Sequence, residues 1–124
     1  MLVKILRCKL HRATVTECDL NYQGSLAIDA DLIREAGFLI NEHIEVYNID
    51  NGERLTTYVI EGKAGSGIIS LNGAAARKAC RGDKIIICSY AQMTPEEAKA
   101  HKPRVVVLGD GNKIERITST PGSH

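Results

Sequence analysis

The chain has 124 residues, of which 16 are Lys or Arg and 15 are Asp or Glu, so its formal net charge is +1. This length predicts one domain around a single core, and the near-neutral charge gives no basic arm for nucleic acid and no polybasic patch for a membrane. With four tyrosines, one phenylalanine and no tryptophan, the composition also disfavours an aromatic platform for stacking bases.

The cysteines and the N-terminal residues indicate the compartment. No C-x-x-C pair and no histidine at zinc-ligand spacing occurs, so we expect no metal site and reduced thiols in or near the core. Charged residues interrupt the apolar residues at the N-terminus, which is not a signal-peptide pattern, and no run approaches membrane-spanning length. These features predict a cytoplasmic protein, where thiols stay reduced. The cysteines are Cys8, Cys18, Cys80 and Cys88.

The first half of the chain is predicted to form strands around one short helix. Residues 2–11 and 13–17 alternate apolar and polar side chains, which is the period of half-buried strands. The segment "DADLIREAG" predicts a helix capped by Asp29 or Asp31 and ended by Gly37. Two strands, "HIEVYNI" and "ERLTTYVIE", flank Asn51-Gly52, which predicts a hairpin with a type I′ turn.

The second half continues with short elements. An apolar run, "IISL", precedes a tight turn into a small helix, "NGAAARKAC", and then a buried strand, "KIIICSY". In "TPEEAKAH", Thr94, Pro95 and Glu97 give a capping box with proline at the first helical position. A last hairpin joins "PRVVVLG" to "KIERIT", and residues 119–124 are predicted to be a flexible tail. The fold class is mainly β, with about seven or eight strands.

Two segments repeat a pattern of short helix, turn and buried strand. Residues 40–48 and 80–89 align at an offset of 41, which places Asn41 with Gly82 and Ile44 with Ile85. Two interlocked copies of such a unit in one domain suggest a closed barrel with pseudo-twofold symmetry, which also removes open strand edges.

No familiar catalytic pattern occurs, because the G-x-S-x-G elbow, the nucleotide-binding glycine loop and H-E-x-x-H are all missing. Strand alternation places Thr57 on the opposite side from Arg54 and Tyr58, so the hairpin alone cannot aim all three at one point. Each polar residue taken singly is more typical of a solvated surface. Those that could carry chemistry are Lys9, His11, Tyr22, Ser25, Arg54, Thr57, Tyr58 and Asn72.

Several stretches of the sequence, taken in order, resemble those of a known protein family. The stretches "KLHRATVTECDLNYQGSLAID", "NGERLTTYVI", "SLNGAAA", "GDKIIICSYA" and "KPRVVVL" closely resemble the pyruvoyl-dependent aspartate decarboxylases, from about Met1 to Ile117 and without an insertion. That family makes β-alanine for pantothenate synthesis. The cysteine load and the tail after Ile117 depart from the family pattern but lie outside the positions of the proposed chemistry.

The resemblance implies that the chain cleaves itself between Gly24 and Ser25 into residues 1–24 and 25–124. The Ser25 hydroxyl would attack the Gly24 carbonyl, and elimination and hydrolysis would convert residue 25 into a covalently bound pyruvoyl group. Glycine at 24 leaves the carbonyl open to attack and tolerates a strained backbone. The family places the Thr57 hydroxyl at the developing oxyanion.

The resemblance also implies roles for the other polar residues. The pyruvoyl ketone at residue 25 would form a Schiff base with L-aspartate and accept the electron pair left by decarboxylation. Lys9 and Arg54 match cations that bind the substrate carboxylates, and Tyr58 matches the proton donor to Cα. The remaining matches are Thr57, Asn72, Gly73, Ala74 and Ala75 beside the substrate, with His11 and Tyr22 at its edge.

The resemblance implies a double-psi β-barrel in a homotetramer, with active sites between subunits; charge, apolar runs and cysteine spacing separately predict no nucleic acid, no membrane and no metal. Whether a maturation factor assists the cleavage stays open. Two other interpretations compete: a non-enzymatic barrel used as an interaction module, and an enzyme whose freed Ser25 is an N-terminal nucleophile that hydrolyses amides.

Overall fold

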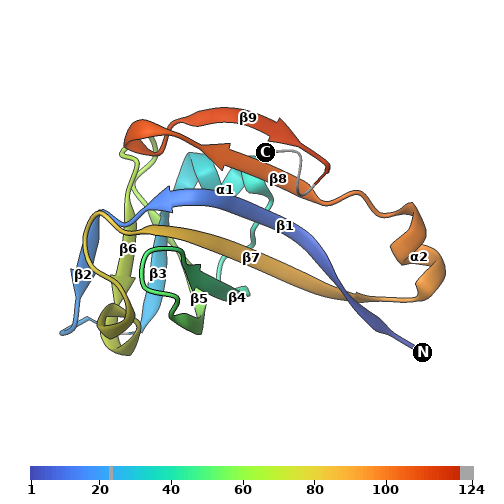
Figure 1. Cartoon of the computed structure of the whole chain (residues 1–124), viewed down its shortest axis with the longest axis horizontal. Helices are drawn as coiled ribbons and strands as arrows, with labels where there is room; N and C mark the ends of the chain where they lie inside the picture. Colours follow the sequence, from blue (N-terminus) through green and yellow to red (C-terminus); the bar gives the residue numbers. More distant parts are fainter. Residues whose placement is uncertain (23, 121–124) are drawn as a thin grey trace.

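The computed structural model describes residues 1–22 and 24–120 and shows a mainly β protein (Figure 1). The last four residues of the predicted tail lie outside the described residues. Every described strand belongs to one hydrogen-bonded array in the order β2-β6-β3-β5-β4-β7-β1-β8-β9. The elements are β1 (Val3–Thr14), β2 (Glu17–Asp19), β3 (Ser25–Asp29), α1 (Ala30–Ala36), β4 (His43–Asn48), β5 (Arg54–Gly62), β6 (Ile69–Asn72), the 3-10 helix η1 (Gly73–Lys78), β7 (Lys84–Met93), α2 (Pro95–Ala100), β8 (Arg104–Leu108), the 3-10 helix η2 (Asp110–Asn112) and β9 (Ile114–Thr118).

The array closes on itself through the short link between β1 and β2. These strands lie near opposite ends of the array, yet only Val15 and Thr16 separate them in the chain. The Thr16 backbone N–H donates to Ile69 O of β6 at 2.8 Å, and that of Val15 donates to Asp83 O beside β7 at 2.9 Å. Parallel pairs between β1 and β8, β2 and β6, and β3 and β5 mix with antiparallel ones. The predicted double-psi β-barrel is confirmed.

The repeated unit read from the sequence also appears in the structure. Asn41 and Gly82 both adopt the left-handed conformation, with φ of 70° and 95°, just before β4 and β7. Each turn follows a short helix, α1 or η1, and the two strands pair antiparallel. A residue with positive φ is needed at both places because the chain must reverse sharply from helix into barrel strand.

Local capping chemistry predicted the helix ends correctly. Asp29 caps α1 by accepting from the Asp31 backbone N–H, and Gly37 ends the helix with φ of 93°. At α2, the capping box between Thr94 and Glu97 is present with Pro95 at the first turn. The capping contacts join residues close together in the chain, which is why the sequence is sufficient to place these ends, although Asp29 also accepts from the Gly65 and Gly67 backbone N–H groups.

Two predictions about the strands were wrong in detail. Residues 2–11 and 13–17 contribute mainly to one long strand, β1, which bends at Arg12, where φ is 66° and the register shifts. The hairpin of β4 and β5 exists, but a five-residue loop joins its strands, and only Gly52 there has positive φ, at 76°. A type I′ turn needs positive φ at both central residues, so the turn type differs from the prediction.

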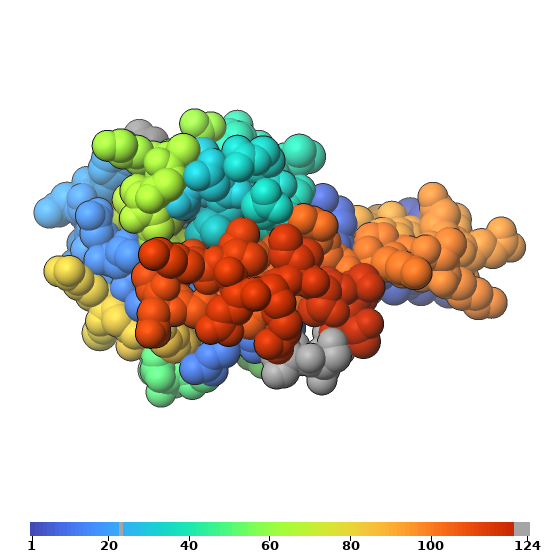
Figure 2. All heavy atoms as spheres, turned by 90° about the horizontal axis from the view of Figure 1, so that it is seen from above, coloured from blue at the N-terminus to red at the C-terminus, as the bar shows by residue number. Residues whose placement is uncertain are grey.

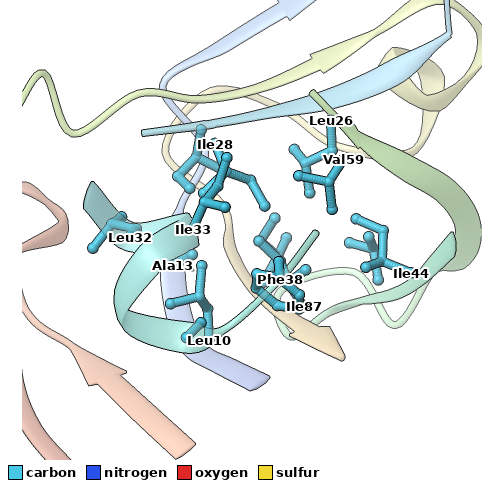
Figure 3. Close-up of a cluster of buried hydrophobic side chains, with 14 of the residues drawn as sticks. Leu10, Ala13, Leu26, Ile28, Leu32, Ile33, Phe38, Ile44, Val59 and Ile87 are labelled. Carbon is cyan, nitrogen blue, oxygen red and sulfur yellow. The ribbon is translucent and has the colours of Figure 1, made fainter. Parts of the chain in front are cut away.

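The core fills the barrel with aliphatic side chains, as Figure 3 shows. Cys8 and Cys88 are buried as expected, whereas Cys18 and Cys80 are exposed, so the expectation of core thiols is wrong for that pair. Burial raises the pKa of Cys8 to about 11, which keeps this thiol protonated at neutral pH. The largest fully buried residues are Leu10, Val15, Leu26, Ile28, Ile44, Val46, Val59, Ile69, Leu71, Ile85, Ile87 and Val105.

An arm extends from the barrel. The start of β1 and the end of β7 run on together beyond the other strands, and α2 sits at the tip, where none of its residues is buried (Figures 1 and 2). No helix among the described residues is long and apolar enough to cross a membrane.

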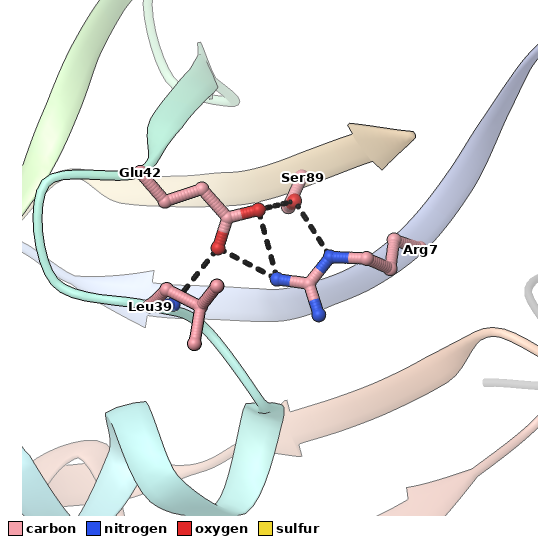
Figure 4. Close-up of polar contacts among 4 residues, drawn as sticks. All are labelled: Arg7, Leu39, Glu42 and Ser89. Atoms are coloured by element: carbon pink, nitrogen blue, oxygen red, sulfur yellow. Dashed lines mark hydrogen bonds and ion pairs between the residues drawn. The ribbon is translucent and has the colours of Figure 1, made fainter. Parts of the chain in front are cut away.

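A polar network ties β1, β7 and the turn before β4 together (Figure 4). Arg7 Nη2 donates to both carboxylate oxygens of Glu42, at 2.6 and 2.8 Å. Buried Ser89 donates to the same carboxylate and accepts from Arg7 Nε at 3.2 Å. Burial alone would raise the pKa of Glu42, but the hydrogen bonds from Arg7 and Ser89 outweigh it and lower the pKa.

Candidate active site

The peptide bond between Gly24 and Ser25 lies at the border between surface and core. Ser25 begins β3 and is only 1 % exposed, whereas Gly24 is exposed. Antiparallel pairing of β3 with β6 sets Ser25 opposite Asn72, and Asn72 Nδ2 donates to Ser25 Oγ at 3.1 Å. The hydroxyl is therefore held in place away from water, beside a peptide bond that solvent reaches.

The close approach of η1 to the backbone at Gly24 requires a glycine at position 73. Its φ is 63°, and a Cβ there would lie 2.7 Å from both N and Cα of Gly24 and 2.9 Å from Tyr22 O. No ordinary side chain fits between the start of η1 and this backbone. At Gly24, by contrast, an added Cβ would meet nothing within 4 Å.

A cleft of about 370 Å³ opens beside Gly24, between β5 and η1. Five predicted site residues line it: Gly24, Thr57, Tyr58, Ala74 and Ala75. The other lining residues are Leu55, Thr56 and Lys78, which the sequence did not suggest.

The alternation of side chains along β5 does not prevent Thr57 and Tyr58 from lining the same cleft. Thr57 and Tyr58 point to opposite sides of the strand, yet both line the cleft, because it is built between two elements and not on one face of a sheet. Among the described residues that line the cleft, Lys78 is the one cation, and its Nζ lies 3.0 Å from Glu53 Oε2. Only the packing of η1 on β5 places Lys78 there, so no local signal could have identified it.

Lys9 and Arg54 lie elsewhere, on the outer face of the sheet. Register pairs Lys9 with Cys88, Cys88 with Glu45, and Arg54 with Tyr47, so these side chains share one face of β1, β7, β4 and β5. We call it the cation face. Neither cation lines the cleft. In a single chain, therefore, neither predicted substrate cation lines the cleft, although Arg54 lies on the same face of β5 as Thr56 and Tyr58, which do.

Arg54 is held on the cation face by an aromatic ring. Its guanidinium lies 4.4 Å from the ring centre of Tyr47. The Tyr47 hydroxyl donates to Glu45 Oε1 at 3.1 Å and lies 2.9 Å from that of Tyr90. The predicted two-residue turn at Asn51-Gly52 would have set Ile49 opposite Arg54, so the sequence could not have identified Tyr47; the observed five-residue loop sets Tyr47 there.

The charge of Arg54 remains available for an anion. Burial raises the pKa of both Tyr47 and Tyr90, so each phenol stays neutral at physiological pH. Within residues 1–22 and 24–120, neither Arg54 nor Lys9 takes part in an ion pair. Planar guanidinium and compact ammonium groups of this kind suit a substrate with two carboxylates.

The two predicted edge residues lie in further depressions. His11 lines one of about 300 Å³ together with Arg12, Lys84 and Arg116. Exposed Tyr22 lines another of about 240 Å³, which also reaches Ile60 and Asn72. In the described part of the chain, no three His, Cys, Asp or Glu side chains gather where a metal ion could bind.

These observations define a double-psi β-barrel protein whose candidate site surrounds one Gly-Ser peptide bond. The chain belongs to the aspartate decarboxylase family, which its sequence matches over residues 1–115. An aspartate 1-decarboxylase of Ralstonia nicotianae is 60% identical over 113 residues, which cover 91% of this chain and 94% of the relative. The same-named protein of Bacillus velezensis is 56% identical over 116 residues, or 94% and 91% of the two chains. That of Caldicellulosiruptor saccharolyticus is 54% identical over 119 residues, or 96% and 93%.

Proposed function

We propose that this chain is an aspartate 1-decarboxylase, which removes the α-carboxylate of L-aspartate as carbon dioxide and leaves β-alanine for pantothenate synthesis. Relatives of that name are 54–60% identical and cover more than nine-tenths of the chain. The structural observation that carries the proposal is the buried Ser25 hydroxyl, held by Asn72 next to the peptide bond that opens on the cleft.

The precursor cleaves itself at this bond. The Ser25 Oγ attacks the carbonyl carbon of Gly24, the C–N bond breaks, and the hydroxyl proton ends on the released amine, which leaves an ester. Removal of the Cα proton then breaks the Cβ–Oγ bond, and the Gly24 carboxylate departs with the electron pair. Hydrolysis of the resulting dehydroalanine releases ammonia and leaves a pyruvoyl group on residue 25. Thr57, in the same cleft as Gly24, is the donor we assign to the oxyanion.

The residues around Gly24 and Ser25 fit a pyruvoyl group at position 25. Gly73 lets η1 approach the backbone at 24, and Asn72 offers an N–H to an oxygen at residue 25. The cleft beside them leaves space for a small substrate. When present, the pyruvoyl group supplies the electron-accepting carbonyl that decarboxylation at Cα needs.

The side chains of the protein bind the substrate and move a proton. We assign Lys9 and Arg54 to the two carboxylates of aspartate, and Tyr58 to the return of a proton to Cα. Asn72 and the segment 73–75 line the bound substrate. His11 and Tyr22 have supporting positions at its edge.

The lining of the cleft supports an assembly of several copies. We propose a homotetramer in which the cleft of one subunit meets Lys9 and Arg54 of another, because neither cation lines the cleft of its own chain. Exposed thiols at Cys18 and Cys80 suit a reducing compartment, so we place the reaction in the cytoplasm.

Intact mass spectrometry tests this function. The purified protein is expected to contain residues 1–24 and 25–124 as separate chains, the larger one lighter than its serine form by one ammonia. A chain that stays at full length after prolonged incubation, with or without cell extract to supply a maturation factor, contradicts the proposal. An unmodified N-terminal serine would favour the amide hydrolase instead.

The variant Ser25→Ala provides the matched control. It lacks the attacking hydroxyl and the precursor of the pyruvoyl group, so it should stay at full length and release no carbon dioxide from aspartate. Release of carbon dioxide by this variant would refute the assignment of Ser25.

A further inference from the structure

A chain of buried polar side chains leads from Ser25 into the sheet. Asn72 Nδ2 donates to Ser25 Oγ at 3.1 Å, and Asn72 Oδ1 accepts from Ser70 Oγ at 3.0 Å. Ser25, Asn72 and Ser70 are 1 %, 5 % and 4 % exposed. The register of β3 with β6 pairs Ser25 with Asn72 and Ala27 with Ser70, so all three polar side chains share one face. Paired strands, not a loop, therefore build this chain of hydrogen bonds.

We propose that Ser70 is a positioning residue for the self-cleavage. Its hydroxyl holds the carboxamide of Asn72 with the NH₂ group toward Ser25 Oγ. This proposal rests on the function proposed above. It adds Ser70 to the residues that take part in self-cleavage, and Ser70 acts only by orienting Asn72.

The two ends of a carboxamide are chemically different, and the difference matters here. The NH₂ end donates hydrogen bonds, whereas the oxygen only accepts them. While Ser70 donates to Oδ1, the NH₂ end faces Ser25. Without that donor, one end of the amide is unsatisfied in either orientation, so the native orientation loses its advantage over the rotated one, in which Oδ1 accepts the Ser25 proton.

The rotated amide would oppose the chemistry at Ser25. During the attack on Gly24, negative charge develops on Oγ as its proton leaves, and that charge passes to the Gly24 carbonyl oxygen as Oγ bonds to the carbonyl carbon. Oγ then takes the electron pair when the Cβ–Oγ bond breaks in the elimination. An N–H aimed at Oγ stabilises both charges, and a carbonyl oxygen in its place would repel them.

Two substitutions at position 70 that have the same shape distinguish the effect of the hydroxyl group from the effect of side-chain packing. Ser70 borders the depression of about 240 Å³ that also contacts Ile60 and Ile68, so one added methyl group has space. Ser70→Thr keeps the hydroxyl, while Ser70→Val replaces it with a methyl group of similar size. Both carry a β-branched side chain, which strands accommodate well.

The experiment follows cleavage of freshly synthesised full-length chain into residues 1–24 and 25–124 by mass spectrometry. Ser70→Thr should cleave at close to the wild-type rate, and Ser70→Val about tenfold more slowly, as expected for loss of one buried hydrogen bond. Circular dichroism and thermal midpoints establish that both are folded. Ser89→Ala, which removes a buried hydroxyl from the Arg7 and Glu42 network, should cleave at the wild-type rate.

A double-variant cycle keeps the test decisive if the larger side chains prevent folding. Ser70→Ala should slow cleavage alone, but added to Asn72→Ala it should slow cleavage no further, because Ser70 acts through Asn72. Equal rates for Ser70→Thr and Ser70→Val, or additive effects in the cycle, would overturn the positioning role. A wild-type chain that never cleaves would instead overturn the proposed function itself.

Discussion

The cleft beside Gly24 and the cation face hold their functional groups in different ways. Around the cleft, small residues and buried neutral hydrogen bonds position Ser25, and Gly73 permits two backbone segments to touch. On the cation face, long charged side chains lie on the surface, and a cation–π contact orients Arg54. The first region suits a reaction of the chain on itself, which needs short fixed distances. The second suits the capture of a charged substrate from water.

This contrast implies that maturation and decarboxylation depend on different residues. In the proposed mechanism, self-cleavage needs only groups around Gly24 and Ser25. We propose that decarboxylation needs those groups and the cations as well, and we therefore expect it to require contact between copies. Variants of the two regions should therefore separate the two reactions.

The largest effect is expected from mixing two inactive chains. Ser25→Ala lacks the reactive group but keeps the cation face, whereas Lys9→Ala/Arg54→Ala matures but lacks the cations. Co-expressed, they should form mixed assemblies that release carbon dioxide from aspartate, although each alone is inactive. Mixing either variant with itself is the control. No recovered activity in assemblies shown by mass to contain both chains would place the whole site within one subunit.

A large effect on maturation alone is expected for Thr57→Val. This isosteric change removes the hydroxyl from the cleft that Gly24 lines, and loss of one oxyanion donor costs about 100-fold or more in rate. The half-time of cleavage, followed by mass spectrometry, measures it. Thr56→Val is the matched control on the next residue of the same strand and should cleave much faster than Thr57→Val. Wild-type cleavage by Thr57→Val would remove Thr57 from the processing mechanism.

The sequence predicted those structural features that depend on residues close together in the chain. The caps at Asp29 and Thr94 follow from neighbouring residues, and the family resemblance brought Thr57 and Tyr58 into the site. The bend at Arg12 was not predicted, because a bulge depends on the partner strand.

Packing between distant elements determines the features that the sequence missed. Whether Cys18 and Cys80 are buried, and whether Lys78 reaches the cleft, depends on where η1 docks. The importance of Gly73 follows from its contact with Gly24, 49 residues away in the chain. Turn propensity could not distinguish this glycine from the others.

A smaller effect, on decarboxylation alone, is expected for Arg54→Lys. Lysine keeps the positive charge but loses the planar fork that pairs two carboxylate oxygens and stacks on Tyr47, so kcat/KM for aspartate should fall about tenfold. Maturation should proceed at the wild-type rate. Steady-state kinetics on fully matured protein measure the first and intact mass the second. Arg34→Lys, at a surface ion pair with Asp31, serves as the control. A slower cleavage of Arg54→Lys would contradict the division between the two regions.

The smallest expected effect is on the stability of the fold, and it arises at Glu42, outside both the cleft and the cation face. The pKa of Glu42 is lowered from 4.5 in the folded state, so its stabilising effect is complete above that value and is lost as pH falls through the folded pKa. Glu42→Gln should lower the free energy of unfolding at neutral pH by about 1–3 kcal/mol, because Arg7 loses its charged partner. Denaturant unfolding of processing-blocked Ser25→Ala chains, with and without Glu42→Gln, measures this difference at several pH values. It should shrink below pH 4.5, since wild-type Glu42 then becomes neutral as well. A difference that is constant with pH would mean that the ion pair with Arg7 contributes nothing, and that Glu42 acts through packing and the Leu39 hydrogen bond alone.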